Sequence, residues 1–163
     1  MSSTRREWLR TMGALGAGPL IPRELWQQAP QSPADRLAAF RAGFGSIPIK
    51  AEPLSENLTL LSGPGGNVVV LRDKDALILV DTFAAPAWPK LEETLKTFGG
   101  RVKIVINTHW HLDHTDNNPQ LRALGATVVA CENTRRRMTE PHHLAVLEVD
   151  VPPSPIGALP QRV

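Results

Sequence analysis

The sequence predicts an α+β domain in which an antiparallel meander precedes two strand-helix-strand units. Three short apolar runs at residues 58–61, 67–71 and 76–80 are separated by turn-forming residues. Two further apolar runs, at 102–106 and 127–130, each follow a segment with helical spacing that ends in glycine. Short apolar runs between turns are typical of a meander, and strands that alternate with helices are typical of parallel pairing.

Length and composition are compatible with one domain or part of one. The chain has 163 residues, including 15 prolines and 12 glycines. Four arginines against two glutamates in residues 1–29 account for the whole formal net charge of +2. Because the rest of the chain is balanced, the charge does not predict a nucleic-acid partner.

Residues 1–29 resemble a twin-arginine export signal peptide, which predicts a bacterial periplasmic location. Arg5 and Arg6 are followed by a weakly apolar run at residues 11–21 that is too short for a stable membrane span. An ordinary basic helix is the alternative, since no clear Ala-x-Ala cleavage site follows. The single cysteine, Cys131, allows no internal disulfide and leaves the redox compartment open.

Residues 30–54 are interpreted as a lead-in with one short helix that begins near Ser32, and strand structure is expected to begin at Leu58. The glycine-rich segment 62–66 is interpreted as a hairpin turn. It is not a phosphate loop, because no Gly-Lys-Ser/Thr follows and the next element is a strand. The main domain is predicted at 55–140, and a proline-rich tail without periodicity at 141–163.

Two consecutive crossovers place the ends of three strands on one edge of the sheet. Helices are predicted over 86–98 and from Asn118, and a third over 132–140 with its arginines exposed to solvent. Asp81 ends one of the three strands, so it is expected near the loop that follows strand 102–106. From position alone, Asp81 is as well explained by a turn or cap role as by a role in orienting a ligand.

That loop, residues 107–116, concentrates potential metal ligands and is called the histidine loop below. In an extended backbone His109, His111 and Asp113 share a face, whereas His114 joins them only if the backbone turns after His111. Two metals satisfy this constraint, with His109 and His111 on one and Asp113 and His114 on the other. Imidazole and carboxylate are ligands typical of zinc.

Three further residues are weaker candidate ligands. His142 and His143 lie outside any predicted strand end, so they are interpreted as surface residues. Cys131 is interpreted as a small buried residue, because cysteine is often simply packed.

The pattern His109-x-His111-x-Asp113-His114, after a β-rich segment that ends in Asp81, resembles the signature of the metallo-β-lactamase fold superfamily. The resemblance covers roughly residues 55–140. It implies the N-terminal half of a four-layer αββα sandwich with two Zn²⁺ ions bound as described above. It also implies that Asp81 supports the histidine loop.

The resemblance implies a hydrolase that uses a metal-bound hydroxide oriented by Asp113, acting on a small-molecule lactam, ester, thioester or phosphodiester. The later histidines and bridging aspartate of the family are not found after His114 in the expected setting. The chain is therefore expected to be a first half, truncated within the domain. Residues 116–118 are Asp-Asn-Asn where the family commonly has glycines.

Two alternatives stay open. The chain could be a non-catalytic half-domain that binds metal weakly, or that needs a complementary C-terminal half or a second copy to cover its sheet. A flavin-dependent oxidoreductase that uses iron is the other alternative, although such relatives use a different ligand set.

Overall fold

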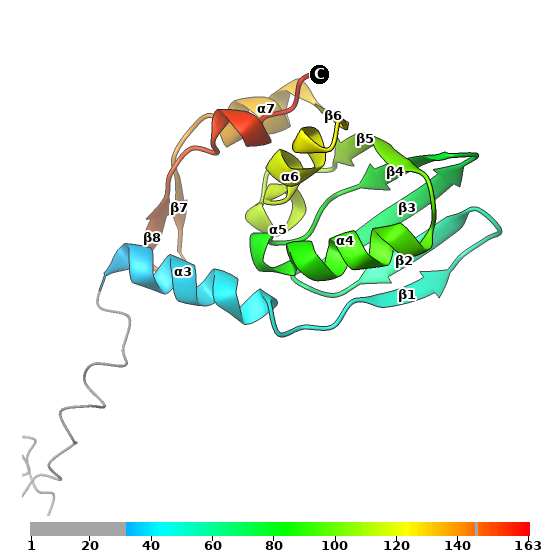
Figure 1. Cartoon of the computed structure of the whole chain (residues 1–163). Helices are drawn as coiled ribbons and strands as arrows, with labels where there is room; N and C mark the ends of the chain where they lie inside the picture. Colours follow the sequence, from blue (N-terminus) through cyan, green and yellow to red (C-terminus); the bar gives the residue numbers. More distant parts are fainter. Residues whose placement is uncertain (1–31, 146) are drawn as a thin grey trace, which may run out of the picture. The chain divides into compact units, whose positions relative to one another are not determined.

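Six strands form one mixed sheet in the order β1-β2-β3-β4-β5-β6 (Figure 1). This computed structural model describes residues 32–145 and 147–163, so the predicted export signal lies outside the described residues. The strands are β1 (Lys50–Pro53), β2 (Leu58–Ser62), β3 (Asn67–Asp73), β4 (Ala76–Val80), β5 (Arg101–Asn107) and β6 (Thr127–Ala130).

Strand pairing confirms the predicted α+β fold. β1 to β4 pair antiparallel, as a meander does, and β4, β5 and β6 pair parallel. Parallel neighbours need a crossover, and each crossover here contains a helix. The ends of β4 and β5 consequently meet at one edge of the sheet, where the histidine loop begins.

The helices of the two crossovers lie over one face of the sheet (Figure 1). The first helix, α3, has a capping box in which Ser32 and Asp35 satisfy each other's backbone N–H groups. The helical segments are α3 (Pro33–Phe44), η1 (Ala85–Ala87), α4 (Trp88–Thr97), α5 (Leu112–Thr115), α6 (Asn118–Ala123), α7 (Glu132–Met138) and η2 (Ile156–Ala158).

The core lies between the sheet and these crossover helices. Leu91 and Leu95, one helical turn apart on α4, are buried against the inward-facing strand residues. Full burial of such a side chain contributes about 1.5–3 kcal/mol. The inward-facing strand residues are Leu61, Val68, Val70, Leu77, Leu79, Val105 and Val128.

The opposite face of the sheet is apolar but only partly covered. Paired positions form one row across five strands, and its member on β5, Ile106, is 40% exposed whereas the adjacent Val105 is fully buried. A second row lies beside the first. The rows are Leu60, Val69, Val80, Ile106 and Val129, and Leu58, Leu71, Ile78, Ile104 and Thr127.

Strand structure begins earlier than predicted. β1 pairs with β2 from Lys50 onward, so the expectation that strands begin at Leu58 is wrong. All four β1 residues are exposed at the sheet edge, and such a strand carries no apolar alternation to reveal it.

The tail beyond residue 140 also contains regular structure. β7 (His142–Leu144) and β8 (Val149–Val151) form a separate two-stranded antiparallel sheet. Arg162 forms a parallel bridge with Val129, so the last residues extend the edge of the main sheet.

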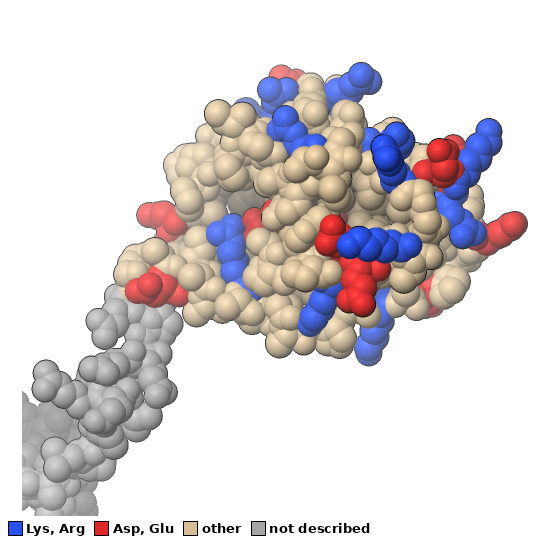
Figure 2. All heavy atoms as spheres, in the orientation of Figure 1, with Lys and Arg blue, Asp and Glu red and all other residues tan. Residues whose placement is uncertain are grey.

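Cys131 and three arginines of α7 lie at the surface of the protein. Cys131 is exposed, so its interpretation as a buried residue is wrong; it precedes α7 and its thiol contacts the Thr134 hydroxyl instead. Arg135, Arg136 and Arg137 are exposed as predicted. Figure 2 shows acidic and basic side chains intermixed over the face in view.

Within the described chain, no helix has the length and hydrophobicity needed to cross a bilayer.

Candidate metal centre

The histidine loop follows β5 and turns where the sequence predicts. His111 has an extended backbone (φ −62°, ψ 149°) and stands immediately before α5. The helical turn of α5 then carries Asp113 and His114 back toward the end of β4. The backbone thus turns after His111, which is the condition for His114 to join the other three residues of the loop.

The side chains of the loop form two close pairs. His109 Nε2 lies 3.2 Å from His111 Nδ1, and His114 Nε2 lies 3.2 Å from Asp113 Oδ2. The His109 and His114 rings are 4.0 Å apart, centroid to centroid, so the two pairs adjoin. The loop thus presents imidazole nitrogens and a carboxylate at one place.

Asp81 lies directly behind the loop, as the edge argument predicts. Its carboxylate is buried and accepts three hydrogen bonds. Oδ1 accepts the Thr108 backbone N–H at 2.8 Å, and Oδ2 accepts the Thr108 hydroxyl at 2.7 Å and His114 Nδ1 at 2.9 Å. Asp81 therefore holds both ends of the histidine loop.

Asn117 holds the backbone that positions Asp81. Asp81 and Phe83 both have positive φ angles, 65° and 63°, which are unfavourable for non-glycine residues. The buried Asn117 amide donates to the carbonyl oxygens of Thr82, Phe83 and Ala84 at 2.6, 3.1 and 3.1 Å. These bonds stabilise a turn that local preferences disfavour.

The neighbours of Asn117 also have structural roles. Asn118 and Asn107 are both buried and exchange side-chain hydrogen bonds, and Asn107 also donates to the His114 carbonyl at 3.0 Å. Asp116 accepts a bidentate pair of bonds from Arg41 of α3, at 3.0 and 3.1 Å. Residues 116–118 therefore bond the end of the histidine loop to α3, to the turn after β4 and to the end of β5.

Two glycines of the turn between β2 and β3 approach the site closely. A Cβ at Gly65, which has φ +94°, would lie 2.6 Å from Asp113 Cβ. A Cβ at Gly66 would lie 3.1 Å from His114 Cε1. The sequence predicted a hairpin turn here, and its three glycines were the only signal of this approach.

The electrostatics differ among the loop residues. Burial lowers the pKa of His109, and the His114 and His111 rings add to this shift. Hydrogen bonds with Asp113 and Asp81 raise the pKa of His114 to about 9. Burial raises the pKa of Asp113, but the hydrogen bond and charge of His114 outweigh it, so this pKa lies below its ordinary value.

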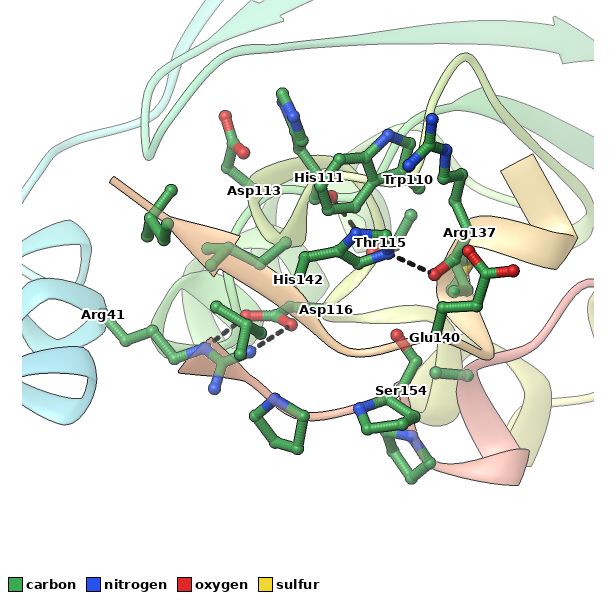
Figure 3. A pocket seen from close by; sticks show the side chains of 18 of the residues that line it. Arg41, Trp110, His111, Asp113, Thr115, Asp116, Arg137, Glu140, His142 and Ser154 are labelled. Atoms are coloured by element: carbon green, nitrogen blue, oxygen red, sulfur yellow. Dashed lines mark hydrogen bonds and ion pairs between the residues drawn. The ribbon is translucent and has the colours of Figure 1, made fainter. Parts of the chain in front are cut away.

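A cavity of about 260 Å³ adjoins the histidine loop, and His111 and Asp113 are among the residues that line it (Figure 3). Trp110 lines it and stacks on His142 with ring centroids 4.0 Å apart. The exposed His143 pairs with Asp150 at 2.9 Å. His143 is exposed, as predicted, whereas the prediction that His142 is a surface residue is wrong, because it is partly buried in β7 and lines the cavity.

Two sets of metal ligands fit the geometry. One consists of the loop residues His109, His111, Asp113 and His114, and the other includes Asp81. Asp81, His109 and His114 each offer one ligand atom within 4.8 Å of the others. However, both Asp81 oxygens already accept hydrogen bonds from Thr108 or His114. The geometry therefore favours Asp81 as a residue that orients ligands, with the loop residues themselves as the donors.

A family model described as the metallo-beta-lactamase superfamily matches residues 61–161. BJP-1, a subclass B3 metallo-beta-lactamase of Bradyrhizobium japonicum, is 23% identical with a TM-score of 0.54; the match covers 65% of this chain and 44% of that one. A metallo-beta-lactamase of Cronobacter sakazakii is 19% identical with a TM-score of 0.61, over 78% and 47%.

A further solved structure, described as the first B3 metallo-beta-lactamase with an active-site glutamic acid, is 26% identical with a TM-score of 0.55, over 64% of this chain and 41% of that chain. The chain therefore spans less than half of the length of these structures. The curated proteins contain no match to it.

Proposed function

Because the chain belongs to the metallo-beta-lactamase superfamily, we propose that its histidine loop forms part of a zinc-dependent hydrolase site. The observation that carries this proposal is the convergence of His109 Nε2 with His111 Nδ1, beside the pair of Asp113 and His114. His109 and His111 would hold one zinc ion, and Asp113 and His114 a second.

The donor set fits zinc on two grounds. First, imidazole nitrogen and carboxylate oxygen are zinc ligands. Second, His109 and His114 each have one ring nitrogen bound to Thr108 or Asp81, which leaves the other ring nitrogen facing a further donor of the loop. A ligating histidine usually has this arrangement, because the bond at one nitrogen orients the other.

When bound, zinc lowers the pKa of a coordinated water toward ~7 and polarises an acyl or phosphoryl oxygen. The lowered pKa of Asp113 keeps its carboxylate ionised, so it can accept a hydrogen bond from the attacking water and orient it. His114 has to release its proton before Nε2 can bind a metal, since its pKa is about 9.

We propose a small-molecule substrate with a lactam, ester, thioester or phosphodiester bond. The subclass B3 metallo-beta-lactamases among the matched structures support a lactam as the first class to test. The assay is hydrolysis of a chromogenic β-lactam by the zinc-loaded full chain.

Metal titration tests the proposed ligands independently of turnover. We expect the full chain, stripped with a chelator, to bind two equivalents of Zn²⁺, and His109→Ala or Asp113→Ala to lose one of them. His143→Ala is the matched control, because that side chain is exposed and outside the cluster. Equal zinc binding by all of these variants would contradict the ligand assignment.

The uncovered sheet face supports a second proposal, that the chain functions as a half-domain covered by a complementary apolar surface. Two rows of paired residues cross that face, all of them apolar except Thr127, and Ile106 on β5 is 40% exposed. Large exposed apolar patches mark interaction sites. We expect the chain to self-associate in light scattering and Ile106→Lys to reduce this; a monomer at all concentrations would contradict self-association.

We also propose periplasmic export, on the strength of the paired Arg5 and Arg6 before an apolar run. Replacing both arginines by lysine keeps the charge and removes the motif. We expect the variant to accumulate in the cytoplasm on cell fractionation, and equal export of variant and parent would count against this route.

A further inference from the structure

The hydroxyl of Thr108 lies between a buried carboxylate and a histidine of the loop. Thr108 Oγ1 is 2.7 Å from Asp81 Oδ2 and 2.9 Å from His109 Nδ1. The Thr108 backbone N–H also donates to the other oxygen of Asp81, at 2.8 Å. Two bonds to one carboxylate hold the threonine in place.

The donor and the acceptor in each of these hydrogen bonds can be assigned. An ionised carboxylate only accepts, so the single hydroxyl proton of Thr108 is donated to Asp81. The hydroxyl oxygen then has only lone pairs to offer His109, and Nδ1 of His109 has to carry the proton. Neutral imidazole has one N–H, so the lone pair lies at His109 Nε2. That atom faces His111 Nδ1 at 3.2 Å.

We propose that Thr108 is a positioning residue that fixes His109 in the Nδ1–H tautomer, so that Nε2 is presented to a metal. Asp81 then orients two histidines, His114 by direct contact at 2.9 Å and His109 through the threonine hydroxyl. One buried carboxylate serves both ligand pairs of the site. The metal-binding part of this inference depends on the proposed function, whereas the tautomer part does not.

His114 provides an internal reference. Its Nδ1 contacts Asp81 directly at 2.9 Å, whereas the bond from Asp81 to His109 passes through the Thr108 hydroxyl. Removal of that hydroxyl should therefore change the tautomer of His109, together with the donor and acceptor roles in its bond to His111, and leave Nδ1–H of His114 unaffected.

The test compares Thr108→Val with Thr108→Ser in the metal-free full chain. Valine has the shape of threonine without the hydroxyl, and serine keeps the hydroxyl without the methyl group. Nitrogen-15 NMR of histidine side chains distinguishes the two neutral tautomers. We expect Nδ1–H at His109 in the parent and in Thr108→Ser, and its loss in Thr108→Val. An unchanged Nδ1–H signal in Thr108→Val would overturn the inference.

Zinc and cobalt affinity give the second measurement. Loss of a partner that orients a ligand typically weakens metal binding 10–100-fold. We expect a loss of about this size at one of the two metal equivalents in Thr108→Val, and full affinity in Thr108→Ser. If serine weakens binding as much as valine does, the methyl packing of Thr108 matters and its hydroxyl does not.

Two controls separate a failure of this inference from misfolding of a variant and from a failure of the proposed function. Circular dichroism and unfolding curves show whether each variant is folded, and Thr108→Ser is the reference if Thr108→Val is unstable. A parent chain that binds no zinc would contradict the proposed function, yet the His109 tautomer would still be measured in the same metal-free samples and would decide the role of Thr108.

Discussion

Asp81 Oδ2 lies 2.9 Å from His114 Nδ1, a contact that joins the end of β4 to the turn after β5. The two residues are 33 positions apart in the sequence and meet because β4 and β5 are parallel neighbours. The contact orients the His114 ring and links the geometry of the histidine loop to the sheet. Each variant below tests one contact that supports the histidine loop or the turn after β4.

Asp81→Asn should weaken both proposed metal sites. Asparagine replaces one carboxylate oxygen by an NH2 donor, so it cannot accept all three bonds. Either the Thr108 backbone N–H, or the Thr108 hydroxyl together with His114 Nδ1, loses its acceptor. We expect 10–100-fold weaker zinc binding for both equivalents, measured by competition with a chelating dye. The matched control is Asp75→Asn, an exposed turn residue. Zinc affinity equal to that of the control would refute the role of Asp81.

The stability of the metal-free chain should fall as pH rises. Folding raises the pKa of His114 from 6.5 to about 9, so the folded state binds its proton more tightly than the unfolded state does. This contribution is complete below pH 6.5 and is lost as the pH rises through about 9. Urea unfolding across this range should show the decline.

His114→Gln should remove that pH dependence, whereas His143→Gln, at an exposed position, should retain it. The same proton competes with metal. We therefore expect zinc binding in the parent to strengthen with pH up to about 9 and to release a proton, which calorimetry in buffers of different ionisation enthalpy detects. A flat unfolding profile in the parent would show that His114 has its ordinary pKa.

Gly65→Ala should destabilise the fold and distort the site. A left-handed backbone costs about 1–2 kcal/mol in a non-glycine residue, and the new Cβ would stand 2.6 Å from Asp113 Cβ. Gly43→Ala is the control, since nothing lies within 4 Å of a Cβ there and alanine favours its helix. We expect thermal unfolding to show a lower midpoint for Gly65→Ala and an equal or higher one for Gly43→Ala. Equal midpoints for both variants would refute the close approach.

Asn117→Leu should destabilise the chain more than an ordinary surface change. The variant removes the Asn117 donor from the carbonyl oxygens of Thr82 and Phe83, at a cost of about 1–3 kcal/mol for each group left unsatisfied. The Ala84 carbonyl oxygen still accepts the Ala87 backbone N–H. Asn67→Ala, at an exposed position, is the control. Chemical denaturation gives both values, and a cost within experimental error of the control would show that the turn holds without Asn117.

Much of the fold and of the site was predictable from local pattern. The apolar runs at 76–80 and 127–130 coincide with β4 and β6. Parallel pairing across two crossovers then placed Asp81 beside the histidine loop before any contact was known. The spacing also showed that His114 can join His109, His111 and Asp113 only if the backbone turns after His111, and α5 provides that turn.

By itself, the sequence determined the order of elements, the loop that carries the ligands and the edge of the sheet where it lies, because periodicity and spacing are local properties. Only the tertiary structure decided that Thr108 bridges Asp81 and His109, that Gly65 adjoins Asp113, and that β1 pairs at an edge. Apart from the neighbouring Thr108–His109 contact, these pairings join residues far apart in the chain. Their geometry depends on how the turns and strands pack against one another, and no local pattern records that packing.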